Sequence, residues 1–338
     1  MDALSGRRIV LVGGAGFIGH NLALRLKELG ADVYIIDSLA VNNLYSIKNN
    51  ADTIPNSKLY LNIIQQRLDL LKEKNISLIE LDSRDYIKYS ETISGLDIDT
   101  LIHLAAVSHA DRSNKDPYST FDHSLRTLEN SLDIARSSKL RIKHFIYFSS
   151  SMIYGNFITG SVTEETPCEP IGIYGALKFA GEKIVVAYNQ VFGLPYTILR
   201  PSALYGPRCV ARRVGQVFIE NALQGLEISI QGDGSSRLDF TYIDDLAGGI
   251  VNVLENENSK NQIFNMTYGE SRSISQMADI LAEHFPGVKI KYLPKDQLTP
   301  DRGTLNVDKA RRMIGYNPKY PLERGFVEYI KWYKSIWE

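Results

Sequence analysis

Tyr174 and Lys178 are the residues whose types and spacing most clearly suggest chemistry. They lie four positions apart in the segment Tyr174-Gly-Ala-Leu-Lys178, and four residues along a helix place two side chains on one face. The lysine ammonium group can lower the pKa of the phenol. The tyrosine can then take or give a hydroxyl proton while a hydride moves to or from C4 of a nicotinamide ring. This pair therefore predicts a redox site.

The stretch Ile9–Asp37 has the pattern of a dinucleotide-binding unit. The runs Ile9–Val12 and Val33–Ile36 are rich in β-branched residues, which is typical of parallel strands buried on both faces. Regularly placed leucines between the two runs indicate a helix, and Gly30 is a natural residue to end it.

Three glycines and one acid in this unit point to the ligand. Gly13 allows a tight turn, Gly16 lets the backbone approach a pyrophosphate, and Gly19 lets the helix pack close to the strand. The helix N-terminus then faces the phosphates with free N–H groups. Asp37 lies 18 residues after Gly19, where a carboxylate accepts the ribose hydroxyls of NAD and repels the 2′-phosphate of NADP. We therefore predict NAD as the cofactor.

Another buried strand is expected at Leu101–Ala106, and its small terminal residues let a nicotinamide ribose lie against the backbone. The predicted cofactor-binding set combines the glycine turn, the strand ends and the catalytic pair. Its members are Gly13, Gly16, Phe17, Ile18, Gly19, Asp37, Asp82, Ser83, Leu104, Ala105, Ala106, Tyr174 and Lys178.

Several longer motifs resemble one enzyme family. The spacing Gly13-x-x-Gly16-x-x-Gly19, the run RPSALYGP at 200–207 and the run HLAAVSHADRS at 103–113 are similar to those of extended short-chain dehydrogenases/reductases. Within that superfamily, the chain resembles the NAD-dependent nucleotide-sugar epimerase/dehydratase family from about residue 7 to its C-terminus.

The resemblance implies roles for further residues. Ser150 lies where the family places a serine or threonine that hydrogen-bonds the sugar oxygen, and Ser151 is the alternative. Asp82 would accept the adenine amino group, or would instead cap the next helix. His109 would lie near the substrate. We therefore predict Tyr174, Lys178 and Ser150 as the catalytic residues.

One departure from the family bears on the reaction. The 4,6-dehydratases place an Asp-Glu pair directly after the catalytic hydroxyl residue, and this chain has Ser151 and Met152 there. Methionine cannot exchange a proton, so we expect C4 epimerisation through a transient 4-keto sugar, with NAD retained. The alternatives are a dehydratase with a different base, an oxidase or reductase of a nucleotide sugar, and a catalytically silent dinucleotide sensor. Candidates for a different base are Glu164, Glu165, Cys168 and His109.

A second departure concerns the substrate diphosphate. Leu238 stands where relatives carry an arginine, and Arg237 precedes it. Because adjacent side chains of a strand point to opposite faces, Arg237 reaches the same phosphate only if the loop shifts. The nucleobase of the substrate could be uracil, thymine, guanine or cytosine. Predicted substrate-binding residues are His109, Ser151, Met152, Arg208, Arg213, Arg237 and Arg302, with Arg212 a further candidate for the diphosphate.

Alternating strands and helices up to about residue 200 predict an α/β fold. We expect a doubly wound parallel (Rossmann) sheet with a smaller, mixed α/β C-terminal substrate lobe. The NAD-binding domain would span 1–200, with a return near 238–265, and 201–338 would mainly bind the nucleotide sugar. Helices are predicted at 59–74, 117–138, 174–192, 214–223, 275–284, 307–314 and 322–337.

Composition limits the possible partners. The chain has 338 residues, 38 basic and 39 acidic, with a net charge of −1, so no nucleic-acid surface or basic membrane anchor is indicated. Cys168 and Cys209 have no metal-ligand spacing, and we predict no metal. No apolar run approaches the roughly 18 to 20 residues of a membrane span. We expect a cytoplasmic protein. The family resemblance implies a homodimer formed through the predicted helices 117–138 and 174–192.

Overall fold

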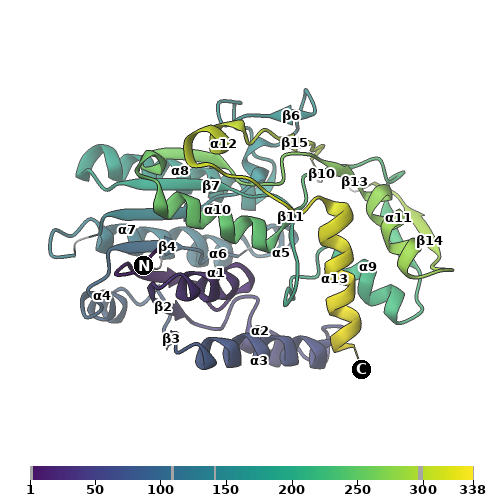
Figure 1. Ribbon diagram of the computed structural model, residues 1–338, viewed down its shortest axis with the longest axis horizontal. Helices are drawn as coiled ribbons and strands as arrows, with labels where there is room; N and C mark the ends of the chain where they lie inside the picture. The colour runs from purple at the N-terminus through teal and green to yellow at the C-terminus, as the bar shows by residue number, and fades with distance from the viewer. Residues whose placement is uncertain (1–2, 108–109, 141, 296–299, 338) are drawn as a thin grey trace.

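A parallel sheet of seven strands forms the centre of the protein in the computed structural model (Figure 1). The structure describes residues 3–107, 110–140, 142–295 and 300–337. The strand order is β12-β7-β5-β4-β1-β2-β3, and every pairing in this sheet is parallel. The predicted doubly wound fold is thereby confirmed. The strands are β1 (Arg8–Val12), β2 (Asp32–Asp37), β3 (Ser77–Glu80), β4 (Thr100–His103), β5 (His144–Phe148), β7 (Tyr196–Arg200) and β12 (Gln262–Asn265).

Helices cover both faces of this sheet, because alternate residues of each strand point to opposite sides. In β1, Ile9 and Leu11 join a core with α1 and α10, whereas Val10 and Val12 join a second core with α4, α7 and α8. The helices that build these layers are α1 (Phe17–Glu28), α2 (Leu44–Asn49), α3 (Ser57–Glu73), α4 (Tyr86–Ser94), α5 (Ala110–Lys115), α6 (Pro117–Phe121), α7 (Thr127–Ala135), α8 (Gly172–Phe192), α10 (Ile243–Glu255) and α12 (Asp308–Ile314). Short 3₁₀ turns lie at η2 (Ser151–Tyr154) and η3 (Glu257–Ser259).

Two expected elements differ from the structure. The predicted helix 117–138 is divided: α6 is followed by a π-helical turn, η1 (Asp122–Arg126), and α7 then ends at Ala135. The Thr127 hydroxyl donates to the carbonyl oxygens of both His123 and Ser124, a local bond at the point where the helix changes its period. The predicted strand at 101–106 ends at His103, so Leu104–Ala106 is irregular and lies at the carboxyl edge of the sheet.

The C-terminal lobe is mixed, as expected. Its core lies among α9 (Val214–Leu223), α11 (Ile274–His284) and α13 (Leu322–Ile336), which gather at one end of the molecule (Figure 1). Short strands complete this lobe and its junctions: β6 (Ser161–Val162), β8 (Leu204–Tyr205), β9 (Ile228–Gln231), β10 (Arg237–Leu238), β11 (Thr241–Tyr242), β13 (Arg272–Ser273), β14 (Ile290–Leu293) and β15 (Thr304–Leu305). Because β12 returns to the main sheet next to β7, the chain crosses between the lobes more than once. Among the described helices, none has the length and apolar character to cross a bilayer.

A buried carboxylate, Glu220 of α9, joins three helices. It is 2% exposed. One oxygen accepts hydrogen bonds from Tyr60 (2.6 Å) and Asn56 (2.9 Å), and the other accepts from Tyr333 (2.8 Å) and Gln216 (2.8 Å). Tyr60 belongs to α3, so this cluster ties the Rossmann side of the molecule to the C-terminal lobe.

We expect Glu220→Gln to destabilise the protein by about 2–4 kcal/mol. The amide offers one oxygen in place of two, and its NH₂ group would face two donors. Urea unfolding followed by circular dichroism measures this change. Glu91→Gln, on the exposed side of α4, is the control and should change stability by less than about 0.5 kcal/mol. Equal stability of both variants would contradict the role assigned to Glu220.

Candidate active site

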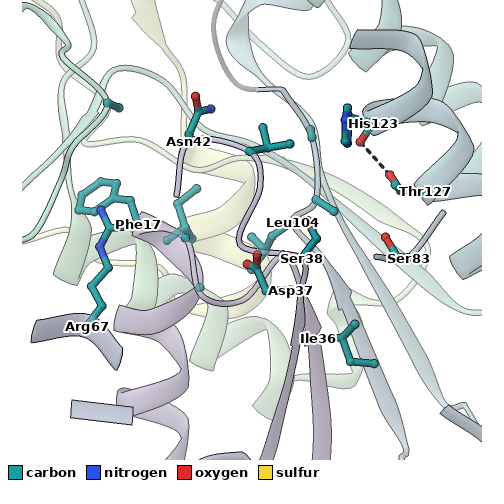
Figure 2. Close-up of a pocket in the computed structure, with 18 of the residues that line it drawn as sticks. Phe17, Ile36, Asp37, Ser38, Asn42, Arg67, Ser83, Leu104, His123 and Thr127 are labelled. Atoms are coloured by element: carbon teal, nitrogen blue, oxygen red, sulfur yellow. Dashed lines mark hydrogen bonds between the residues drawn. The ribbon is translucent and has the colours of Figure 1, made fainter. Parts of the chain in front are cut away.

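A cleft opens at the carboxyl edge of the sheet, over the turn between β1 and α1 (Figure 2). Of the thirteen residues predicted to bind the cofactor, eleven line this cleft; Tyr174 and Lys178 are not among its lining residues. The eleven are Gly13, Gly16, Phe17, Ile18, Gly19, Asp37, Asp82, Ser83, Leu104, Ala105 and Ala106. The cleft therefore brings together segments that are up to 200 residues apart in the chain, from Gly13 to Arg213.

The three glycines of the turn have different reasons to lack a side chain. Gly13 has a φ of +78°, and a Cβ there would lie 2.7 Å from the backbone nitrogen of Ala105. A Cβ on Gly19 would collide with the backbone of Gly14. At Gly16 the nearest atom would be the carbonyl oxygen of Gly13 at 3.4 Å. Gly13 and Gly19 therefore allow neighbouring backbone segments to pack in close contact. Gly16 leaves space over the cleft.

Asp37 lies at the centre of the cleft (Figure 2). Its carboxylate accepts the N–H groups of Ala15 (2.9 Å) and Leu39 (2.8 Å). Burial raises the pKa of this carboxyl group, and the two backbone hydrogen bonds act in the opposite direction. Each carboxylate oxygen retains a lone pair, so the side chain keeps acceptor capacity for hydroxyl donors.

Asp82 lines the same cleft but is already engaged by Arg84. The Arg84 guanidinium lies against both carboxylate oxygens, with its closest contact at 2.6 Å, and the Arg84 backbone N–H also donates. The alternative that Asp82 caps the next helix is wrong, because the N-cap of α4 is Asp85, whose side chain accepts the Lys88 N–H. An adenine contact by Asp82 stays a prediction.

Tyr174, Ser150 and Lys178 come together beside the segment that ends β5. Tyr174 and Lys178 lie one turn apart on α8, and Ser150 is near enough to the Tyr174 hydroxyl to influence its pKa. Ser150 is the N-cap of η2 and accepts the Met152 N–H at 3.2 Å. Burial raises the pKa of Tyr174, whereas Arg213, the bond to Ser150, and Arg302 lower it.

The Lys178 ammonium group is buried and donates to the Phe148 carbonyl oxygen at 2.6 Å. Burial lowers its pKa to about 8, and the charge of Glu182, one turn further along α8, acts to raise it. Glu182 pairs with Arg200 at 2.8 Å, and both side chains are 3% exposed. A buried ion pair thus lies one helical turn from Lys178, on the C-terminal side of it along α8.

An inner pocket adjoins the cleft, and Arg213 lines both. Arg302 also lines the inner pocket, and its buried Nε has no partner among the described residues. Burial, followed by the charge of Arg213, lowers the Arg302 pKa to about 10. Since both arginines act on Tyr174, this pocket offers positive charge beside the candidate catalytic oxygen.

The other predicted substrate residues are placed differently. Ser151 is buried and Met152 half-buried in η2. Arg237 donates to Ser271 and lines a surface pocket that shares Arg302 with the inner pocket, whereas its neighbour Leu238 lines the inner pocket. Arg208 donates to His20 (2.9 Å) and to Asn21. These roles stay predictions, and His109 lies outside the described residues.

Two of the alternative bases for an elimination, Glu164 and Cys168, have partners away from the cleft and the inner pocket. The Glu164 carboxylate accepts the Asn265 N–H at 2.8 Å, and burial raises its pKa. Cys168 is half-buried with its thiol near the Thr166 carbonyl oxygen, and burial raises the thiol pKa. Neither residue lines the cleft or the inner pocket.

Sequence reasoning missed several lining residues, of which Arg67 and His123 are the most polar. Arg67 carried a readable signal, since it falls on the apolar stripe of α3 formed by Tyr60, Ile63, Ile64 and Leu71. His123 carried none, because it lies in the π-helical turn. The other missed lining residues are Ile36, Ser38, Val41, Asn42, Leu81, Thr127, Leu204, Val210 and Ala211.

Comparison with known proteins agrees with this geometry. Residues 9–267 match the family model described as the NAD dependent epimerase/dehydratase family. The chain belongs to this family. It is 29% identical to an uncharacterized UDP-glucose epimerase, YtcB, of Bacillus subtilis, over 98% of this chain and 99% of that protein. It is 28% identical to UDP-glucuronate 4-epimerase 1 of Arabidopsis thaliana, over 98% of this chain and 78% of that protein.

A solved member of the family has the same architecture. The structure of UDP-glucuronic acid 4-epimerase from Bacillus cereus, in complex with UDP-glucuronic acid and NAD, matches with a TM-score of 0.84 and 26% identity. The match covers 98% of this chain and all of that one. The architecture of this epimerase/dehydratase chain is therefore shared along nearly its whole length.

We expect Gly13→Ala to destabilise this family member by at least about 2 kcal/mol more than Gly6→Ala. Gly6 has a φ of +79°, nearly that of Gly13, and a Cβ there would meet no atom within 4 Å. In both variants, the alanine must adopt a left-handed backbone conformation, which lowers the free energy of unfolding. Only Gly13→Ala adds a collision with the backbone of Ala105. Thermal and urea unfolding measure the difference. Equal losses would show that backbone strain alone accounts for the effect.

We expect burial of the Lys178 charge to make stability depend on pH. The folded pKa of about 8 lies below the unfolded value of 10.5, so between these values the unfolded state binds more protons. Stability relative to Lys178→Met should then rise with pH by up to about 1.4 kcal/mol per unit and level off outside this window. Urea unfolding from pH 7 to 11 tests this, with Lys183→Met of the same helix as control. A pH-independent difference would contradict the buried charge.

Proposed function

We propose that the protein is an NAD-dependent nucleotide-sugar 4-epimerase that works through a transient 4-keto sugar and retains NAD. The observation that carries this proposal is the position of the Tyr174 hydroxyl beside Ser150, with Lys178 one turn away on α8. Among the described residues, no Asp or Glu lines the inner pocket, so the acid pair of an elimination is not found there. The names of the relatives, UDP-glucose and UDP-glucuronate epimerases, favour the same reaction.

The residues of the cleft fit NAD. Gly16 leaves room for a diphosphate at the start of α1, the Asp37 carboxylate can accept ribose hydroxyls, and the buried Nη1 of Arg67 has no partner among the described residues. NAD, when bound, supplies the hydride acceptor and donor. The solved relative from Bacillus cereus contains NAD.

The chain's own groups can perform the proton transfers. Tyr174 removes the proton of the sugar C4 hydroxyl and later returns it, and Ser150 hydrogen-bonds the same oxygen in both states. The Lys178 charge stabilises the tyrosinate. NAD, when bound, would accept the hydride from C4, and its reduced form would supply that hydride to the other face of the 4-keto sugar, which would give the C4 epimer. Ser151 and Met152 offer no strong acid or base, so the C6 hydroxyl is kept.

The inner pocket would hold the nucleotide part of the substrate. Arg213 and Arg302 bring two positive charges to its wall, which suits a diphosphate. We also infer a homodimer, since α6 and α8 leave large apolar side chains exposed. These are Tyr118 (87%), Phe121 (49%), Val191 (71%) and Phe192 (48%).

The test is to incubate the purified protein with UDP-, GDP-, CDP- and dTDP-sugars and to follow the products by NMR. We expect a 4-epimer with no net change in NADH absorbance. Tyr174→Phe should lower kcat by about 10²–10⁴-fold, whereas Tyr188→Phe, which removes a hydroxyl from the same helix, should leave it within about two-fold. A 6-deoxy-4-keto product would identify a dehydratase instead. NADH that accumulates with a keto sugar would identify an oxidase, and equal turnover by wild type and Tyr174→Phe would refute the catalytic assignment.

A further inference from the structure

Arg67 is a buried cation. Neither the packing of the fold nor the proposed proton transfers explains why a charged side chain is buried at this place. It is 1% exposed and lies on the apolar stripe of α3. Its Nε and Nη2 both donate to the carbonyl oxygen of Arg208, whereas Nη1 is buried and has no partner among the described residues. A buried donor without an acceptor is costly, and so is a buried charge without a counter-charge.

The charges around Arg67 do not neutralise it. Within the described ranges, no carboxylate lies within ion-pair distance of its guanidinium group; Asp37 acts on it only at longer range, and Arg208 adds a like charge. The pKa of Arg67 falls to about 10, mainly through burial, so the group is charged at neutral pH. It also contributes to lowering the pKa of His20. This part of the molecule is therefore short of negative charge.

Arg67 lines the same cleft as the glycine turn, and Figure 2 shows it beside Phe17, the first residue of α1. The first turn of α1 has no acidic residue, and Gly16 supplies no side-chain cap. The free N–H groups and partial positive charge of this helix end therefore face the cleft together with the guanidinium group. Two independent sources of positive potential meet at one place.

We propose that Arg67 is a cationic residue of the cofactor cleft and that its Nη1 donates to a phosphate oxygen of the dinucleotide pyrophosphate. This inference rests on the proposed binding of NAD in the cleft. The pyrophosphate is the anionic part of NAD, and an oxygen at Nη1 would satisfy both the orphan donor and the unpaired charge. A ribose 2′-phosphate would carry the same chemistry, but Asp37 places a carboxylate on the side of the cleft where the ribose hydroxyls are expected.

The test compares ligands with and without the phosphates. Calorimetric titration gives the affinities of adenosine, ADP, 2′-AMP and NAD for wild type, Arg67→Met and Arg67→Lys. We expect Arg67→Met to lower the affinity for ADP and for NAD by about 10- to 100-fold. The affinity for adenosine should fall by less than about two-fold. Lys72→Met, an exposed cation on the same helix, should bind all four ligands as wild type does.

Arg67→Lys keeps the test decisive if Arg67→Met fails to fold, because it retains a charge and donors for the Arg208 carbonyl oxygen. It should weaken ADP by about 3- to 10-fold and leave adenosine unchanged. An equal loss for adenosine and ADP would show a structural role and overturn the proposal, as would unchanged ADP affinity. A loss confined to 2′-AMP would assign the contact to a 2′-phosphate and also overturn it. If wild type binds ADP and NAD and the variants match it, only this inference fails; if wild type binds neither, the cofactor site itself is refuted.

Discussion

The close contact between the glycine turn and the segment after β4 is the constraint on which the site depends. The backbone of Ala105 fills the space where a side chain of residue 13 would lie, and the backbone of Gly14 does the same for residue 19. These contacts hold α1, β1 and Leu104–Ala106 at van der Waals distance. Because they involve backbone atoms, neighbouring side chains cannot relieve them by changing rotamer. The position of the glycine turn against Leu104–Ala106 is therefore fixed by backbone packing.

The long helix α3 relates this rigid turn to the second lobe. Tyr60 and Arg67 lie two turns apart on one face of α3. The first bonds to Glu220 of α9, and the second bonds to the loop that carries Arg208. Since α9 begins next to the inner pocket and the Arg208 loop borders the cleft, one helix positions parts of both cavities.

The elements with strong periodicity could be predicted from the sequence. Both hydrophobic faces of the parallel sheet, the glycine turn and Asp37 follow from β-branched runs and from the position of an acid at a strand end. Helix boundaries differ by a few residues, as frayed ends generally do. The local pattern of residues 117–138 shows no break, because hydrophobic periodicity contains neither the π-helical turn nor the hydrogen bonds that the Thr127 hydroxyl makes beside it.

The polar side chains of the site were harder to predict, since their orientation depends on tertiary contacts. Arg237 and Arg208 have the charge expected of phosphate ligands, but each bonds to a neighbouring segment of its own chain. The sequence analysis assigns no role to Arg67, although it falls on the apolar stripe of α3. A cation on an apolar helix face deserves the same attention as a motif, because burial of its charge requires a compensating partner.

Arg213 borders the cleft and the inner pocket at once. If Arg213 moves when a ligand binds in one cavity, the wall of the other cavity changes as well. The two cavities therefore share part of their wall. If an occupant of one cavity changes the affinity of the other cavity for its ligand, reciprocity requires the reverse effect to have the same factor.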